Sequence, residues 1–487
     1  MTIKELKPAL VWNIFDQITK VPRPSKKEGK IREWLVNFAK EHNLEYKVDA
    51  IGNVAIFRDA APGFENSKKV VLQGHMDMVC EKTKDANHDF DNDAIETIVE
   101  GEWVRANGTT LGADDGIGMA AALAALTDPD LKVGPLQGFF TIDEETGLTG
   151  ASNVGEGMLS GEYLLNLDSE DDGVITMGCA GGIDTIGTFT YKPEAAPADR
   201  AYVKVNIQKL QGGHSGSDIN AQRASATKLV ARLLWNLKAS YDVVIGNIDA
   251  GNLRNAIAYE GTVTIGVKPA DKAAVTEAIA AFTADVKNEY KLTEPDMEIV
   301  VEDAEAPKTV IDKASAEAVI NAVYVAPHGV DSMSKEIEGL VETSTNLASI
   351  KLKDDDKIVV TTSQRSSVES RKYDLAHRVE QAFKLGGAEV THTQGYQGWQ
   401  PNLDNKILKV GVDAWERLFG VKPVVNAIHA GLECGLFLKV CPNMDMISFG
   451  PTLQGVHSPK ERCHIPAVQK FWDFIVEVLN TVAKEQK

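Results

Sequence analysis

The spacing of hydrophobic residues indicates two kinds of secondary-structure order, which follow each other along the sequence. Up to residue 186, buried strand-like runs alternate with helical segments, for example REWLVNFAKEH, KVVLQG, GIGMAAALAAL, LQGFFTI and YLLNL. From residue 187, strands with period-two alternation such as AYVKVNI are followed by helices such as ASATKLVARLLWNL. The order of the second part predicts a split βαββαβ unit of the ferredoxin-like kind and a second, partial copy of it.

The alternation of strands and helices seen in the first part returns near residue 400. It is seen in the helix NKILKVGVDAWERLF, in the strands PVVNAIH and MDMISFG, and in the closing helix FWDFIVEVLNTVAK. A chain of 487 residues is also too long for one core. We therefore expect a discontinuous α/β catalytic domain, residues 1–186 and 401–487, interrupted by an inserted α+β lid domain, residues 187–400, made of ferredoxin-like units.

Charged side chains close or follow the apolar runs of the α/β part. Because strands of an α/β sheet direct the residues at their ends into a common crevice, these side chains should lie together. Two histidines and several carboxylates in one crevice suit a pair of divalent transition metals, so the pattern predicts a hydrolase. The residues concerned are His75, Asp77, Asp114, Asp115, Glu144, Glu145, Asp168 and His457.

Each of these signals has a plainer alternative. Asp114-Asp115 precedes an apolar helix, where aspartate is a common N-cap, although two adjacent acids exceed what capping needs. Either of them could bridge two metals. Glu144-Glu145 could be a solvated turn; at the end of a buried strand, one could bind metal while the other takes a proton from water. Asp77 could fix the tautomer of His75.

Composition limits the partners and the compartment. The formal net charge of -19 argues against nucleic-acid binding. No run approaches the ~20 apolar residues of a membrane span, and no amino-terminal leader is visible. The five cysteines are scattered without a Cys-x-x-Cys pair, which suits a reducing compartment. We expect a cytoplasmic protein with no membrane or nucleic-acid partner.

The fuller motifs resemble a known family. The strings QGHMDMVCEK, LGADDGIG, TIDEETGLTGA, MGCAGG and GGHSGSDI, with a late GVHS, resemble the di-zinc aminopeptidase, carboxypeptidase and aminoacylase superfamily, and in particular its aminoacyl-histidine dipeptidase (peptidase D) branch. The resemblance extends over essentially the whole chain in order and spacing. One departure is Gly116, which stands where the superfamily usually has lysine.

The resemblance implies a role for each candidate residue. His75 and Asp168 would bind one zinc, Glu145 and His457 the other, and Asp114 would bridge them. Glu144 would be the general base and Asp77 would hold His75. Three further groups of the chain would contact the substrate, and His214 would reach the active site of a partner subunit. The three substrate-binding residues would be Asn255, Arg365 and Gly431.

The resemblance also implies an activity. We expect a di-zinc dipeptidase, with two Zn²⁺ per subunit and Co²⁺ or Mn²⁺ as substitutes, that forms a homodimer through its lid. Its substrates would be unblocked dipeptides of broad specificity, including Xaa-His and β-alanyl-histidine (carnosine). The alternatives are an aminoacylase, carboxypeptidase or tripeptidase of the same superfamily and, more remotely, a non-catalytic binding protein on this fold.

Overall fold

The computed structural model describes residues 2–485, which divide into two compact units. Unit 1 comprises the chain up to Cys179, then Trp399–Ala427, and again from Leu432 onward; unit 2 comprises Ala180–Gly398 and Ile428–Gly431. Within the described residues, no helix is both long and apolar enough to cross a bilayer.

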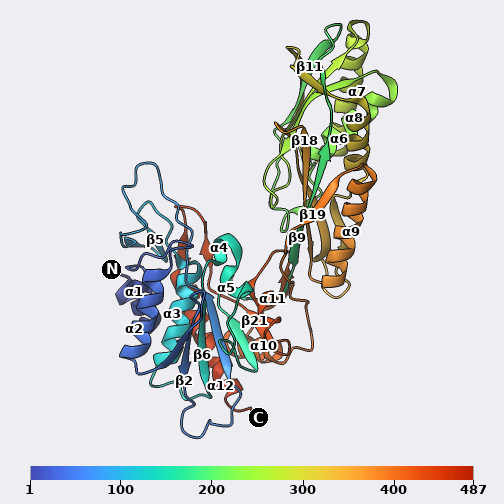
Figure 1. Ribbon diagram of the computed structural model, residues 1–487. Helices are drawn as coiled ribbons and strands as arrows, with labels where there is room; N and C mark the ends of the chain where they lie inside the picture. The colour runs from blue at the N-terminus through green and yellow to red at the C-terminus, as the bar shows by residue number, and fades with distance from the viewer. Residues whose placement is uncertain (1, 486–487) are drawn as a thin grey trace. The chain divides into compact units, whose positions relative to one another are not determined.

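Unit 1 is built around an eight-stranded mixed sheet (Figure 1). Its spatial order is β1 (Glu45–Val48), β2 (Val54–Arg58), β6 (Leu136–Thr141), β3 (Val70–His75), β7 (Tyr163–Asn166), β21 (Asp445–Ser448), β8 (Val174–Cys179) and β20 (Val424–Ile428). The strands β6, β3, β7 and β21 are mutually parallel. β6, β3 and β7 are buried along their whole length, and β21 is buried except at Asp445. Their carboxyl ends therefore meet at one edge of the sheet.

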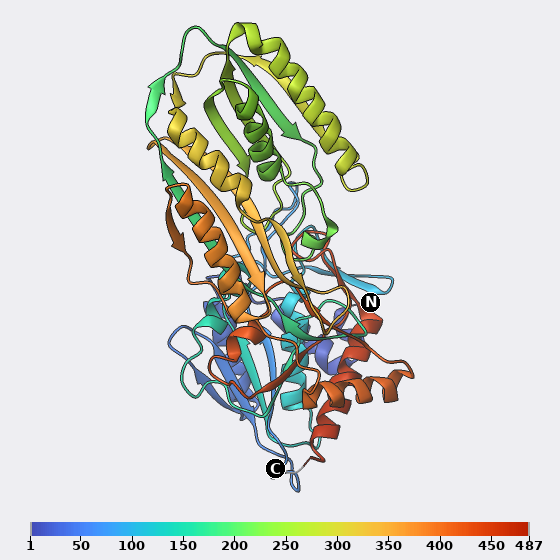
Figure 2. The ribbon, with the colours of Figure 1, turned by 90° about the vertical axis from the view of Figure 1, so that its right-hand side faces the viewer.

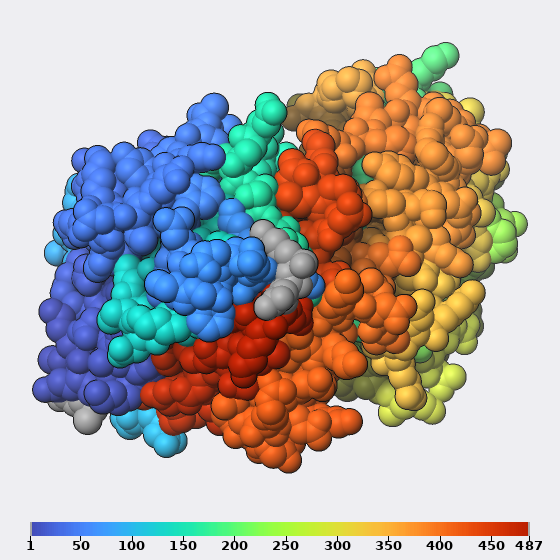
Figure 3. All heavy atoms as spheres, turned by 90° about the horizontal axis from the view of Figure 1, so that it is seen from below, coloured from blue at the N-terminus to red at the C-terminus, as the bar shows by residue number. Residues whose placement is uncertain are grey.

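Helices cover this sheet. Helix α3 packs against β3 and β6 with α1 on top of it, α2 packs against β1 and β2, and α10 packs against β8 and β21 with α12 on it. In Figure 3 the first and last segments of the chain lie side by side in this unit; Ser67, for example, donates to the carbonyl of Ala483 at 2.7 Å. The helices are α1 (Ala9–Ile18), α2 (Gly29–Glu41), α3 (Ala113–Thr127), α4 (Glu144–Gly147), α5 (Thr149–Ser152), α10 (Lys406–Phe419), α11 (Glu433–Phe437) and α12 (Ile465–Val482), with the 3-10 turn Ile3–Glu5.

A small four-stranded sheet completes unit 1. Its order is β22 (Leu453–Gln454), β23 (Arg462–His464), β5 (Trp103–Ala106) and β4 (Thr97–Glu100). The segment between β22 and β23 carries His457, which has a positive φ of 60°. This sheet thus ties the late histidine to residues that lie far earlier in the sequence.

Unit 2 is one continuous eleven-stranded sheet. The two ferredoxin-like halves expected from the sequence join edge to edge through β12 and β17. The main order is β14 (Glu298–Ala304), β11 (Ala201–Gln208), β13 (Gly261–Val267), β12 (Val244–Gly251), β17 (Val341–Lys353), β18 (Lys357–Ser366), β9 (Gly181–Thr190) and β19 (Glu389–His392); β10 (Pro193–Ala195), β15 (Thr309–Ile311) and β16 (Gly329–Met333) pair at its margins.

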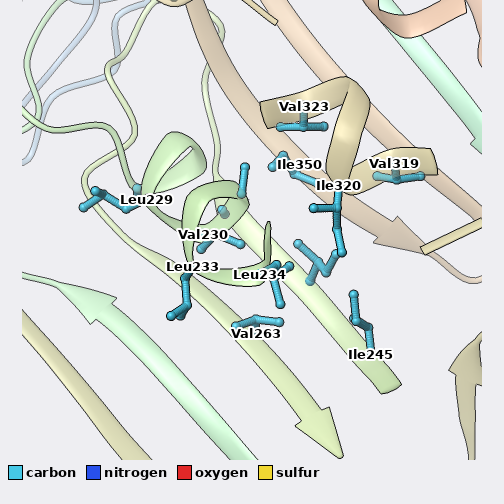
Figure 4. Close-up of a cluster of buried hydrophobic side chains, with 14 of the residues drawn as sticks. Leu229, Val230, Leu233, Leu234, Ile245, Val263, Val319, Ile320, Val323 and Ile350 are labelled. Carbon is cyan, nitrogen blue, oxygen red and sulfur yellow. The ribbon is translucent and has the colours of Figure 1, made fainter. Parts of the chain in front are cut away.

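The long helices of unit 2 cover one face of that sheet (Figures 1 and 2). They are α6 (Ala226–Ser240), α7 (Lys272–Glu289), α8 (Lys313–Val325) and α9 (Glu369–Leu385). Figure 4 shows the core between them: Leu233 and Leu234 of α6 and Ile320 of α8 point toward strand residues such as Ile245 and Val263. In β11 one row of side chains is therefore buried and the other is half-buried, whereas the middle of β17 is buried on both faces.

Candidate metal centre and substrate-binding residues

His75, Asp114 and His457 form the centre of an acidic cluster in unit 1. The two carboxylate oxygens of Asp114 face different histidines: Oδ1 lies 3.0 Å from Nε2 of His75, and Oδ2 lies 3.1 Å from Nε2 of His457. Each histidine has a second carboxylate nearby, Asp168 at 3.4 Å from His75 and Glu145 at 2.9 Å from His457. The geometry is two histidine-carboxylate pairs that share one aspartate.

The neighbouring Asp115 lies in a different environment. Its side chain is buried and packs beside two glycines. A Cβ added to Gly74 would lie 2.0 Å from Oδ2 of Asp115, and a Cβ added to Gly118 would lie 2.1 Å from Oδ1. Asp114 and Asp115 both have non-helical backbone angles although they belong to the first turn of α3. This local break turns the two side chains to different surroundings.

Glu144 and Glu145 lie on the single helical turn α4, beyond the end of β6, whereas the sequence pattern suggested a strand end. A helical turn forms here because carboxylates of Asp77 and Asp143 accept hydrogen bonds from its backbone amides and from threonine hydroxyls. Asp77 accepts from the amides of Glu144 at 3.0 Å and Glu145 at 3.3 Å, and Asp143 accepts from the hydroxyls of Thr146 and Thr149. Asp77 Oδ1 also lies 3.5 Å from Nδ1 of His75.

The electrostatics of the cluster follow from burial of like charges. Burial opposes a charged His75, yet the carboxylates of Asp168, Asp114 and Asp77 outweigh it and raise the pKa of His75 well above its ordinary value. Hydrogen bonds to Asp114 and Glu145 raise the pKa of His457 to about 11. Burial raises the pKa of Asp168 to about 7 and also raises that of Glu144. Such a site favours added positive charge.

The donor set fits divalent metal ions. His75, Asp114 and Glu145 offer ligand atoms that lie within 4.8 Å of one another, and Oε1 of Glu145 is buried without a hydrogen-bond partner. An unsatisfied buried carboxylate oxygen is costly unless a cation or donor meets it. Imidazole nitrogens combined with carboxylate oxygens suit zinc and its neighbours among the divalent ions.

A buried polar network lies behind this cluster and was not anticipated from the sequence. Glu433, at the start of α11, accepts from Gln73 at 2.6 Å and from Thr141 at 2.8 Å, and Gln73 accepts from Asn166 at 2.6 Å. Burial raises the pKa of Glu433 to about 7. The strand residues precede His75, Glu144 and Asp168 by two or three positions, so polar residues inside otherwise apolar strands were the available signal.

Arg365 is the centre of a second group, which lies in unit 2. It is 8% exposed, and among the described residues Glu342 and Glu369 form their ion pairs with Arg371 and Lys372 rather than with Arg365. Its Nη1 donates to the hydroxyl of Tyr396 at 3.0 Å, while its Nε is buried without a partner. An added Cβ at Gly431 would lie 3.0 Å from the Tyr396 ring. A buried guanidinium without an acidic neighbour is suited to binding an anion.

His214 and His429 are electrostatic neighbours of Arg365. Nδ1 of His214 accepts from the amides of Gly216 and Ser217, both at 3.2 Å, so the neutral ring carries its proton on Nε2. Burial and Arg365 lower the pKa of His214. His429 pairs with the hydroxyl of Ser344 at 2.7 Å, and burial together with Arg365 lowers its pKa to about 3.

The remaining candidate, Asn255, is linked to this group through its backbone rather than through its side chain. It is exposed, and its backbone carbonyl accepts from the amide of Ser215 at 2.8 Å. It therefore lies next to the His214 segment through the main chain. Ser344 and Tyr396 are members of the group that sequence reasoning missed, and His429 is a member whose role the sequence left undecided.

The chain belongs to peptidase family M20/M25/M40, whose family model matches residues 71–481. It is therefore a peptidase with an M20-type α/β fold, as the motifs predicted. The cytosol non-specific dipeptidase of Escherichia coli (strain K12) is 38% identical over 481 residues, 99% of each chain.

The solved structures agree with this assignment. The crystal structure of an aminoacylhistidine dipeptidase from Vibrio alginolyticus matches 100% of this chain and 99% of its own, with 41% identity and a TM-score of 0.93. These matches confirm the resemblance to the aminoacyl-histidine dipeptidase branch. A tripeptidase from Staphylococcus aureus shares the fold at 15% identity and a TM-score of 0.58, with 99% and 100% of the chains covered.

Proposed function

We propose that this peptidase is a metal-dependent dipeptidase that hydrolyses unblocked dipeptides of broad specificity, including Xaa-His and β-alanyl-histidine. The observation that carries the proposal is the shared carboxylate of Asp114, whose oxygens face His75 and His457 separately. Full-length similarity to two dipeptidases supports the substrate class. Two Zn²⁺ per subunit would be held by His75 with Asp168 and by His457 with Glu145, and Co²⁺ or Mn²⁺ could replace them.

Glu144 is the general base in this proposal. Metal ions bound here would lower the pKa of water and polarise the scissile carbonyl. Glu144 takes a proton from the attacking water and returns it to the leaving amine nitrogen. Asp77 serves this chemistry indirectly, because it accepts from the amides of Glu144 and Glu145 and lies beside Nδ1 of His75.

The substrate would be held by residues of unit 2. Arg365 supplies a buried cation for the free carboxylate of a dipeptide, with Asn255 and the turn at Gly431 as further contacts. His214 donates through Nε2 to the oxyanion that forms in the transition state. We further propose that the lid forms a homodimer, that His214 serves the partner's active site, and that the enzyme works in the cytoplasm.

A metal-removal experiment with a substrate panel tests the function. Chelation should abolish hydrolysis of unblocked dipeptides, and Zn²⁺ or Co²⁺ should restore it. N-acetyl amino acids and longer peptides should be poor substrates because each lacks or misplaces one of the two charged ends. Rapid hydrolysis of N-acetyl amino acids without dipeptide cleavage would instead assign an aminoacylase, and full activity in metal-free protein would refute the mechanism.

A further inference from the structure

Glu461 is a buried carboxylate that binds the backbone at the start of α3. Its two oxygens accept from four successive backbone amides. Oε2 accepts from Leu111 at 2.7 Å and Gly112 at 3.0 Å, and Oε1 accepts from Ala113 at 2.7 Å and Asp114 at 3.3 Å. The side chain is only 2% exposed. Four donors converging on one carboxylate compensate for its burial and fix the direction of four peptide groups.

Arg23 holds the same segment from the other side. Its guanidinium is buried and donates to the carbonyls of Met76 at 3.2 Å, Asp77 at 2.7 Å and Gly112. It therefore joins the segment after β3, which contains Asp77, to the turn before Asp114. Glycine is needed at Gly112 because φ is +68° there and an added Cβ would lie 2.6 Å from Nη2 of Arg23.

The same guanidinium accounts for Gly116. An added Cβ at this position would also lie 2.6 Å from Nη2 of Arg23 and 3.0 Å from the ring of Phe15. Any larger residue would have to displace Arg23 from the carbonyls it binds. The departure noted at this position in the sequence is thus coupled to the arginine.

We propose that Glu461 and Arg23 are positioning residues that hold the Leu111–Asp115 turn so that the two oxygens of Asp114 face His75 and His457. The inference rests on the metal site of the proposed function. Asp114 lies outside helical geometry, so the turn sets the direction of its carboxylate. Glu461 also follows His457 by four residues, and one short segment thus supplies a histidine and orients the aspartate it faces.

Glu461→Gln is the sharpest test, because it preserves size but replaces one acceptor oxygen with an NH₂ group. In either orientation the amide nitrogen would face two backbone donors. We expect the affinity for Zn²⁺ to fall by roughly 10- to 100-fold, as is typical when a group behind a metal ligand is changed. The readout is a competition titration of metal-free protein with Zn²⁺ and a chromophoric chelator.

Glu294→Gln is a matched control. Glu294 is 3% exposed and also accepts from backbone amides, those of Gln211 at 2.7 Å and Ala224 at 3.0 Å, but it lies in unit 2. Urea unfolding of the metal-free proteins should show a loss of stability in both variants. Only Glu461→Gln should bind Zn²⁺ more weakly. A structural role alone would lower stability and leave Zn²⁺ affinity at the wild-type value.

Arg23→Lys tests the other half of the pair. A lysine keeps the charge but cannot reach three carbonyls at once, so it should also weaken Zn²⁺ binding. Wild-type affinity in both Glu461→Gln and Arg23→Lys would overturn the inference, as would failure of both to fold while Glu294→Gln folds. If the wild-type protein itself bound no Zn²⁺ at this cluster, the proposed function would fail instead.

Discussion

Asp114 and Asp115 show how far adjacent identical residues can differ. Asp114 presents its oxygens to two histidines, whereas Asp115 is buried beside Gly74 and Gly118. The sequence indicated that one of them could bridge two metals and left open which. The choice depends on backbone angles in the first turn of α3, and those angles are imposed by Glu461 and Arg23, distant in sequence.

Asp114→Asn should weaken the binding of both metal ions and remove most of the activity, because the shared carboxylate loses its charge and one acceptor oxygen. Asp115→Asn should bind two ions with near wild-type affinity, since the ion pairs of the two histidines are made with other carboxylates. Metal content after dialysis against a weak chelator distinguishes the two. Equal metal loss in both variants would contradict the assignment.

The two glutamates of α4 should separate in the same way. Glu145→Gln should lose metal at one site, because Glu145 faces His457. Glu144→Gln should retain metal but lose on the order of 10²–10⁴ in kcat, the usual effect of removing a general base. Turnover and metal content are measured on the same samples. Wild-type kcat in Glu144→Gln would show that another group accepts the proton.

At the scale of elements, much of the fold could be predicted. The runs VVLQG, LQGFFT and YLLN are the buried parallel strands β3, β6 and β7, as their predominantly apolar character indicated. The helical turn of Glu144 and Glu145 could not be predicted, because its caps come from Asp77 on another segment. Nor could the joining of the ferredoxin-like halves into one sheet, which depends on pairing between β12 and β17.

The candidate site likewise contains residues that have a local signal in the sequence and residues that have none. Residues at strand ends, such as His75 and Asp168, were visible in the sequence because they interrupt apolar runs. Arg23, Glu433 and Glu461 carry no local signal, since a lone charged residue in a loop or helix is usually solvated. Their importance follows from burial and from hydrogen bonds that span long stretches of chain.

A half-buried histidine between α8 and β16, His328, should make the stability of unit 2 depend on pH. Nδ1 of His328 accepts from the amide of Leu347 at 3.0 Å, and burial lowers its pKa to about 4. The unfolded chain, with an ordinary pKa near 6.5, therefore binds more protons between these values. The free energy of unfolding should fall as pH decreases from about 6.5 to 4, by on the order of 3 kcal/mol.

His328→Asn isolates this contribution, because an asparagine oxygen can accept from Leu347 but does not titrate. Urea unfolding of the wild type and the variant should show a stability difference that changes between pH 7 and pH 4. His377→Asn, at an exposed position of α9, is the control and should parallel the wild type. Parallel curves for all three proteins would show that His328 is not responsible.

At the scale of the whole molecule, the groups proposed for catalysis are divided between two units. The metal cluster belongs to unit 1, and His214 with Arg365 belongs to unit 2. The proposal of a homodimer in which His214 acts in the partner's site can be tested by complementation. Mixing inactive His214→Ala with inactive Glu144→Gln should restore part of the activity, since a mixed dimer contains one site with both groups intact.

Subunit exchange must be verified independently in that experiment, for example with differently tagged chains. A His214→Ala homodimer should show a larger loss in kcat than increase in KM, because the oxyanion exists only in the transition state. No recovery of activity after confirmed exchange would mean that His214 acts in its own subunit or has no catalytic role.

Residues Ile428–Gly431 belong to unit 2, although the chain on both sides of them belongs to unit 1. The chain leaves unit 1 after Cys179, returns at Trp399, leaves again for these four residues and returns at Leu432. They bring His429 to Ser344, and the amide of Ala180 donates to the carbonyls of Ile428 and Ala430. A gene fragment encoding only 180–398 would lack this piece. A chimera that exchanged only residues 180–398 would pair Ser344 of one parent with the Ile428–Gly431 segment of the other. Recombination within the family should therefore take both segments of unit 2 from the same parent.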